Sequence, residues 1–139
     1  MKFKIIAGLV LILSVIIASC GSAEDMEFKR YYLGGEQLYK QRCQNCHGTK
    51  GEGLSNLIPP LTDSTFLKTN KKQLACIVNN GLKGALVVVN GKSFVGDMPA
   101  NNIPPVDIAR ILTYITNSFG NKMGTVKSED VALSLKDCK

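Results

Sequence analysis

The sequence lacks tryptophan, any internal repeat and any run of like charges, and it contains a single histidine. Without a basic run it has no electrostatic signature of nucleic-acid binding, so we expect no nucleic-acid partner. At 139 residues and with no repeat, the chain holds at most one small domain with a tail or two. A structural zinc site needs four ligands, so with one histidine it would have to draw on cysteines.

Long apolar runs are also scarce, and the N-terminal Ile5–Ile17 is the notable one. A helix of this length rises about 20 Å, less than the roughly 30 Å hydrocarbon core of a bilayer. The run follows Lys2 and Lys4 and ends in small residues, which is typical of a signal peptide. We therefore predict a lipoprotein-type signal peptide over residues 1–19; the alternative is a permanent N-terminal anchor helix.

The stretch "IASC", which ends at Cys20, resembles the lipobox of bacterial lipoproteins. The resemblance implies that Cys20 is diacylated and becomes the mature N-terminus. Two or more acyl chains hold a protein on a membrane, where a single chain is marginal. Residues 20–33 are rich in charge and show no convincing periodicity, so we predict a tether there. We expect an exported protein, lipid-anchored to a bacterial membrane and facing the periplasm.

Export places the mature chain in an oxidising compartment, where unpaired thiols do not stay idle. With Cys20 assigned to lipid, four cysteines are left: Cys43, Cys46, Cys76 and Cys138. Removing the two signal-peptide lysines leaves 15 basic and 11 acidic side chains, a net charge of +4. This mild excess suits, at most, an acidic face on a partner protein.

The predicted regular elements lie within residues 34–139, which we assign to one domain. Apolar residues recur at helical spacing in three segments, and Asn90-Gly91 after a valine run is a strong hairpin signal. A glycine ends each of the second and third helices. Ser128 is a candidate N-cap for a short last helix. The sequence predicts helices over about 36–46, 71–80 and 105–119, a hairpin near 85–96 and a final helix from 128.

The stretch "CQNCHG" begins at Cys43 and contains the one histidine, His47. A redox dithiol is expected at a strand-to-helix junction, but this motif closes a helix and no parallel-strand pattern surrounds it. A zinc site would combine adjacent Cys46 and His47 with a distant cysteine, which is awkward geometry. Cys-x-x-Cys-His is the spacing of c-type haem attachment, with two thiols for the vinyl groups and a histidine for iron.

A haem used for electron transfer needs a second axial ligand. Met98 lies in "VGDMPA", a polar loop between the hairpin and the last long helix, where a thioether can reach the other haem face. A methionine followed by proline in such a loop is a poor core candidate. Met123 is the competitor. Histidine–methionine ligation raises the reduction potential and keeps small molecules from the iron.

Residues 34 to about 120 resemble a class I monohaem cytochrome c in "GEQLYKQRCQNCHGTKGEG", "PPL", "GDMPA" and "ARILTYI". The resemblance implies an all-α cytochrome c fold, with three to four main helices around one haem c and a small hairpin before the axial methionine. It implies that Gly35 and Tyr39 lie where the first helix crosses the last, against Ile111, Tyr114 and Ile115.

The resemblance also implies roles for residues near the histidine. The Pro59 carbonyl would accept the Nδ1–H of His47, with Pro60 as the competitor, and Leu61 would pack on the haem. Such a bond fixes the imidazole orientation and raises its basicity. Cys76 and Cys138 depart from the family pattern. Because both are exported, we predict a disulfide between them; the alternative is a buried Cys76 and a free thiol at Cys138.

The sequence as a whole predicts a membrane-tethered electron carrier in a respiratory chain, with no small-molecule substrate. The carrier could also be a subunit of a larger oxidoreductase. The expected partners are a quinol-oxidising complex, a terminal oxidase, or a periplasmic dehydrogenase or reductase. Lys40, Arg42, Lys50 and Lys92 are candidates for steering an acidic partner, the alternative being solvated surface charge. The rival functions are a peroxidase-like haem enzyme, a subunit that uses haem only for folding, and a thiol–disulfide oxidoreductase.

Overall fold

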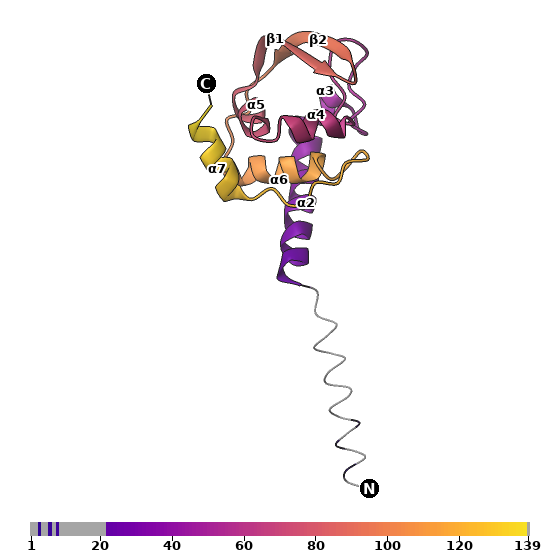
Figure 1. The fold of residues 1–139 in the computed structure, drawn as a ribbon, viewed down its shortest axis with the longest axis vertical. Helices are drawn as coiled ribbons and strands as arrows, with labels where there is room; N and C mark the ends of the chain where they lie inside the picture. Colours follow the sequence, from indigo (N-terminus) through magenta and orange to yellow (C-terminus); the bar gives the residue numbers. More distant parts are fainter. Residues whose placement is uncertain (1–2, 4–5, 7, 9–21, 139) are drawn as a thin grey trace.

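The structure is a computed structural model that describes residues 3, 6, 8 and 22–138. Apart from those three positions, the predicted signal peptide lies outside the described residues, and so does Cys20. In chain order the elements are α2 (Ala23–Arg42), α3 (Gln44–His47), α4 (Ser64–Thr69), α5 (Leu74–Asn80), β1 (Leu82–Val89), β2 (Lys92–Met98), α6 (Pro105–Ile115) and α7 (Ser128–Lys136) (Figure 1).

The described chain is mostly helical, as predicted, but its two-stranded sheet means that the fold is not purely all-α. Figure 1 shows the hairpin at the end of the molecule opposite the start of α2, with the other helices between them. None of the helices within residues 22–138 is long and apolar enough to span a membrane.

The first described helix, α2, begins at Ala23, so the prediction of no regular element over residues 20–33 is wrong for this part. The Ser22 side chain caps the helix by accepting a hydrogen bond from the Asp25 backbone N–H at 3.1 Å. Two acidic residues in the first turn also favour the positive end of the helix dipole. The charged residues that hid the periodicity are good helix formers.

The same helix belongs to the domain core from Tyr31 onward. Tyr31 is 6% exposed, and the Tyr32 hydroxyl lies 2.9 Å from the Ser118 hydroxyl. The helix predicted to run continuously to residue 46 is divided, because α2 ends at Arg42 and the short α3 follows. Tyr31 and Tyr32, just before residue 34, therefore pack against the core of the domain.

Helices α2 and α6 cross closely at Gly35 (Figure 1). A Cβ built on Gly35 would overlap the backbone carbonyl of Arg110 and lie 2.8 Å from the Cβ of Tyr114. The predicted close crossing is therefore present, although the nearest atoms belong to Arg110 and Tyr114 rather than to Ile111 or Ile115. Only a residue without a side chain lets the two backbones approach this far.

Helix α6 carries the centre of the core on its predicted apolar stripe, where Ile108, Ile111, Leu112 and Ile115 are all buried. The helix ends at Ile115, earlier than predicted, and the chain then turns. Phe119 lies beyond the helix end with a φ of 57°. Its ring still packs on Tyr39 and Tyr114, with centroids 5.5 and 5.7 Å away.

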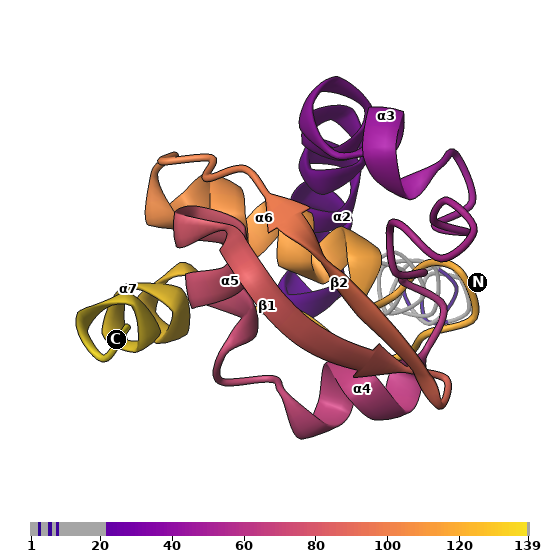
Figure 2. The same ribbon diagram turned by 90° about the horizontal axis from the view of Figure 1, so that it is seen from above.

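Strands β1 and β2 form the predicted antiparallel hairpin. The turn residues Asn90 and Gly91 both have positive φ, 51° and 72°, as a tight two-residue hairpin turn requires. Seen from above, the strands run across the helical layer (Figure 2). The hairpin is fixed at its tip, where the Asn90 N–H donates to Asp63 Oδ2 at 2.8 Å.

Asp63 joins that tip to α4, a helix that the sequence did not predict. Its Oδ1 accepts hydrogen bonds from the backbone N–H groups of Thr65 and Phe66, at 2.9 and 3.2 Å, and so caps the helix. The bond from Asn90, followed by those from Phe66 and Thr65, holds the pKa of the Asp63 carboxyl below its ordinary value. These hydrogen bonds favour the charged form.

Replacing Asp63 with asparagine keeps a capping oxygen but removes the charge. A carboxyl whose pKa is lower in the folded state stabilises the fold above its unfolded pKa of about 3.9, and this contribution is lost as the pH falls through the folded pKa. We expect Asp63→Asn to lower the free energy of unfolding by about 1 kcal/mol at pH 7. Urea unfolding of both proteins at pH 7 and pH 3 should show a smaller difference at pH 3; an equal difference at both pH values would contradict it.

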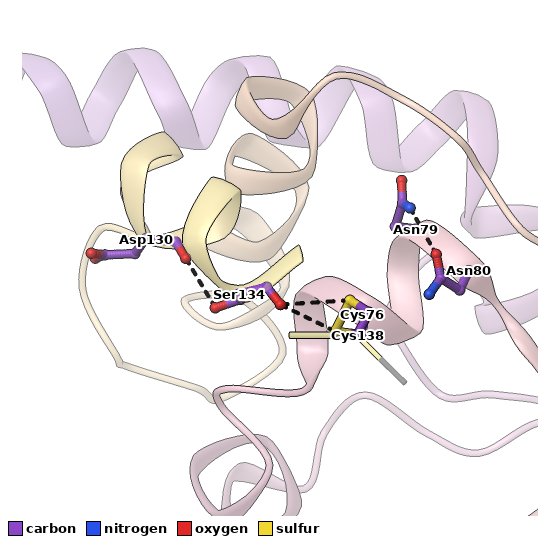
Figure 3. Close-up of a disulfide and its surroundings, with 6 residues drawn as sticks. All are labelled: Cys76, Asn79, Asn80, Asp130, Ser134 and Cys138. Atoms are coloured by element: carbon purple, nitrogen blue, oxygen red, sulfur yellow. Dashed lines mark hydrogen bonds between the residues drawn. A yellow bond between two sulfur atoms is a disulfide. The ribbon is translucent and has the colours of Figure 1, made fainter. Parts of the chain in front are cut away.

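Helix α7 packs beside α5, and a disulfide between Cys76 and Cys138 joins them (Figure 3). The S–S distance is 2.06 Å, and both sulfur atoms lie 3.6 Å from the Ser134 carbonyl oxygen. Ser128 is the first helical residue rather than the predicted cap, a position held by Lys127. The disulfide thus connects the end of the chain to a helix in the middle of the domain.

Removing this disulfide with Cys76→Ser and Cys138→Ser together should lower the free energy of unfolding. The cysteines are 62 residues apart, and in the loop-entropy account a closed loop of this size is worth about 4 kcal/mol. Urea unfolding in non-reducing buffer measures the loss. The control is Ser134→Ala, which leaves the disulfide intact; a double variant as stable as the wild type would refute the prediction.

Candidate haem site

The turn from Cys43 to His47 is built by the end of α2 and the single turn of α3. The backbone N–H groups of Cys46 and His47 both bond the Cys43 carbonyl, at 3.1 and 2.9 Å. This places the two thiols about one helical turn apart, with the imidazole next in line. Cys43 is half-buried, Cys46 is exposed, and both are free thiols. The side chains are thus presented as thioether attachment requires.

Tyr39 holds this turn against the core. It is completely buried, and its hydroxyl donates a hydrogen bond to the Gly48 carbonyl oxygen at 2.6 Å. Burial raises the pKa of Tyr39 well above its ordinary value, so the hydroxyl stays protonated as a donor. The residue that packs at the α2–α6 crossing therefore also fixes the chain directly after His47.

The His47 ring is oriented by Pro59. Its Nδ1 lies 3.1 Å from the Pro59 carbonyl oxygen, which can only accept, so Nδ1 carries the proton and Nε2 is left for a metal. Burial lowers the pKa of His47, although the bond to Pro59 acts in the opposite direction. Neutral imidazole is the form that ligates metals. Of the two prolines considered, Pro59 rather than Pro60 is the acceptor.

Gly53 allows the loop that brings Pro59 to the histidine. It has a φ of 69°, and a Cβ there would lie 2.9 Å from the Pro59 carbonyl carbon. Its backbone N–H bonds the His47 carbonyl at 2.9 Å. A glycine at position 53 therefore lets the loop fold closely enough to bring Pro59 to the histidine.

Two adjoining cavities of about 540 and 650 Å³, both open to solvent, lie between the histidine and the hairpin. Cys46 lines the first and Cys43 the second. Five residues line both cavities and so join them into one cleft: His47, Pro59, Leu82, Val87 and Met98. The predicted packing residue Leu61 lines the second cavity, together with α5 and α6 side chains.

Met98 ends β2, and the loop after it is fastened to the end of α5. The backbone N–H groups of Asn101 and Asn102 bond the Asn79 carbonyl at 3.1 and 3.3 Å, and the Asn101 side-chain amide bonds the Val78 carbonyl at 3.0 Å. The last carbonyls of a helix have no partner within the helix. The loop that carries Met98 satisfies two of them, so helix end and loop hold each other in place.

The cleft fits a haem group. Its walls are largely apolar, the two thiols lie at its lining, and a nitrogen ligand and a sulfur ligand come from separate elements. Met123, the competing sulfur, instead packs half-buried against the hydrophobic core and lines neither cavity. The structure therefore brings together Cys43, Cys46, His47 and Met98.

The alternative sites have less support. A reactive dithiol needs a lowered thiol pKa, whereas burial raises that of Cys43 to about 11. The zinc alternative needed Cys76 or Cys138 as fourth ligand, but these two are bonded to each other. Among residues 22–138, no cluster of three or more histidine, cysteine or acidic side chains is placed to hold a metal ion.

The four basic residues proposed for steering are all exposed. Lys40 forms an ion pair with Glu36 at 2.6 Å, one helical turn away, so part of its charge is compensated. In the described structure Arg42, Lys50 and Lys92 form no such ion pair. These three are the stronger candidates for contact with an acidic surface.

Two parts of the site were not predicted. The inward face of the hairpin is one wall of the cleft, contributed by Ala85, Val87 and Phe94. The alternation of Ala85, Val87 and Val89 along β1 was the available signal. Asn101 was also missed, because nothing in the sequence shows which helix end a loop will cap.

Comparisons with known proteins show two similarities. Residues 32–115 match the family described as cytochrome C oxidase, cbb3-type, subunit III. The chain is also similar to cytochrome c-551 of Bacillus subtilis (strain 168), with 34% identity over 77 residues, covering 50% of this chain and 66% of that protein. The alignment thus spans just under two thirds of the relative. The region that matches the family contains both free cysteines, His47 and Met98.

Proposed function

Because this chain belongs to the cytochrome c family, as a monohaem c-type cytochrome with covalently bound haem c, we propose that it is a membrane-tethered electron carrier of a respiratory chain. It moves one electron at a time between redox proteins on the exported side of a bacterial membrane. Its expected partners are a quinol-oxidising complex, a terminal oxidase, or a periplasmic dehydrogenase or reductase.

Each site residue has a proposed part. Cys43 and Cys46 would form the two thioether links, and His47 Nε2 and the Met98 thioether would ligate the iron. When bound, the haem supplies an iron that alternates between ferric and ferrous states. Pro59 keeps the imidazole in its tautomer and orientation, and the apolar walls exclude water, which helps to set the potential.

The observation that carries the proposal is the placement of His47 and Met98 on the lining of one cleft. A hydrogen bond to Pro59 orients His47, and hydrogen bonds of Asn101 hold the loop that follows Met98. A carrier needs both axial positions filled and held, so that the change of oxidation state needs little rearrangement. A peroxidase-like enzyme needs one position open for substrate. The anchoring of the Met98 loop to α5 favours the carrier.

Two measurements on the purified protein test this function. Ferrous protein mixed with carbon monoxide should keep its spectrum, and ferric protein with hydrogen peroxide should show no peroxidase turnover, because both axial positions are filled. Rapid carbon monoxide binding together with turnover would establish the enzyme instead.

The proposed lipid anchor has its own test. Mass spectrometry of the N-terminal peptide should find diacylated Cys20; an unmodified Cys20, or a chain that keeps residues 1–19, would remove the proposed lipid anchor.

The hydrogen bond from Asn101 to Val78 leads to a further prediction, which concerns the binding of an added ligand. Asn101→Ala removes this bond and loosens the loop that carries Met98. We expect the ferric variant to bind added imidazole about tenfold more tightly than the wild type, the equivalent of one hydrogen bond. The control is Asn80→Ala, which removes an exposed amide at the end of α5, the helix that contains Val78. Equal imidazole affinity in the Asn101 variant and the wild type would contradict the role of this loop.

A further inference from the structure

The hairpin has an apolar face turned toward solvent. Leu86, Val88 and Val95, here called the outer patch, are 65%, 53% and 64% exposed. Leu86 and Val95 are direct partners across the two strands, and Val88 is two residues along β1 on the same side. The outer patch is therefore contiguous rather than a set of scattered side chains.

This composition is unusual for a sheet with one free face. Antiparallel strands that cover a core normally alternate between apolar residues inside and polar residues outside. Here the inward residues Val87 and Phe94 line the cleft, and three outward residues, Leu86, Val88 and Val95, are also apolar. The outward partner of Val88 is the polar Ser93. Contiguous exposed apolar surface with a polar rim marks a site of interaction.

The outer patch is held in a fixed shape. At the hairpin tip, Asn90 bonds Asp63 at 2.8 Å, and near its base the Gly84 N–H donates to Asp97 Oδ1 at 2.7 Å. At the end of β2, the Met98 carbonyl packs directly on Gly81, where any side chain would collide with it. A surface ordered before binding loses less conformational entropy when a partner arrives.

The position of the hairpin indicates whether a membrane or a protein covers the outer patch. It lies at the end of the molecule opposite the start of α2, and α2 alone rises about 30 Å (Figure 1). A membrane that holds the chain just before α2 is therefore at the wrong end to cover the outer patch. A protein that approaches from the other side can reach it.

The charged residues of the hairpin and the distance from the outer patch to the cleft further restrict the kind of protein that can bind. Lys83 is exposed near the base of the hairpin, and Lys92 is exposed at its tip, where it pairs with the inward Val89. Asp97, the one acidic residue of the strands, is engaged with Gly84. Lysines at the two ends of the hairpin suit carboxylates around an apolar centre. Packed sheet layers are about 10 Å apart, so a partner seated on the outer patch lies one layer from the cleft.

We propose that the outer patch is the docking surface for the redox partner of this protein, a protein that presents apolar side chains ringed by carboxylates. The inference rests on the electron-transfer function proposed above. The hairpin would then have two roles: its inner face covers the cofactor and its outer face selects the protein that exchanges electrons with it.

The test compares the double variant Leu86→Ser/Val95→Ser with the wild type. Both ferrous holoproteins are mixed with respiratory membranes of the source organism, prepared from a strain that lacks this gene, and haem oxidation is followed. We expect the variant to react at least about tenfold more slowly, because it replaces two apolar side chains of the outer patch with small polar ones. Ferricyanide, a small oxidant that needs no docking, should oxidise both at the same rate.

The matched control is Leu33→Ser, which removes a side chain that is 62% exposed on α2, away from the hairpin. It should react with the membranes as the wild type does. A charge-reversed Lys83→Glu/Lys92→Glu variant should also react slowly, and its rate should depend less on salt than that of the wild type.

The other outcomes each overturn a specific statement. If the membranes oxidise the wild type and the outer-patch variant equally fast, the docking surface is refuted and the carrier function stands. If they do not oxidise the wild type, the respiratory function fails and the inference fails with it. A wild-type dimer that the double variant abolishes in sedimentation would make a second copy the occupant. Binding to anionic liposomes that the same variant abolishes would make it a lipid surface.

Discussion

Met98→Ala is expected to lower the midpoint potential of the protein by on the order of 0.2 V, within the roughly 0.8 V that axial ligands span. Without the thioether, the ferrous form should bind carbon monoxide, and the ferric methionine–iron charge-transfer band should disappear. The reason is that Met98 is the last residue of strand β2 on the lining of the cleft, and the loop that follows it is tied to α5. Potentiometric titration followed by visible spectra measures all three effects.

Met123→Ala is the matched control for this experiment. Met123 is also half-buried, but it packs on the core rather than on the cleft. Its replacement should leave the potential, the charge-transfer band and the resistance to carbon monoxide unchanged. If the band survives in Met98→Ala and is lost in Met123→Ala, the ligand assignment is wrong.

Gly35→Val is expected to destabilise the fold strongly. Its side chain would overlap the Arg110 carbonyl at the crossing of α2 and α6, and backbone atoms cannot move aside as a flexible side chain can. Forcing the helices apart should cost at least about 3 kcal/mol, a large part of the 5–15 kcal/mol that stabilises a typical domain. Chemical denaturation gives the loss, and the yield of haem-loaded protein should fall with it.

The neighbouring glycine provides the comparison. A Cβ on Gly34 would meet only the Arg110 side chain, at 3.2 Å from its Cδ, and that side chain can shift. Gly34→Ala should therefore be neutral or stabilise the helix by up to about 1 kcal/mol. Similar losses from Gly35→Val and Gly34→Ala would show that the close crossing does not determine stability.

Much of the site could be predicted because its chemistry is encoded in short, local patterns. The spacing from Cys43 to His47 needs only one helical turn to bring its groups together. The hairpin was predictable from Asn90-Gly91, because few residues accept positive φ. The apolar stripe of α6 was equally clear, since its period matches one helix face.

The parts that could not be predicted depend on contacts between distant segments. The first three turns of α2 were predicted to be a charged tether because most of their residues are exposed. The contacts that place Tyr31 and Tyr32 in the domain come from segments far along the chain, such as Ser118 near Tyr32. The end of α6 was placed late because Phe119 packs on the core from a turn rather than from the helix. The anchoring of the Met98 loop through Asn101 is likewise visible only in three dimensions.

The most direct test of the central claim is the visible spectrum of the purified wild-type protein, made in a host that matures c-type cytochromes. The account predicts a haem that stays with the chain after denaturation and, in the ferric form, the charge-transfer band of a methionine–iron bond. A chain that loses its colour on denaturation, or a high-spin ferric spectrum without that band, would contradict it.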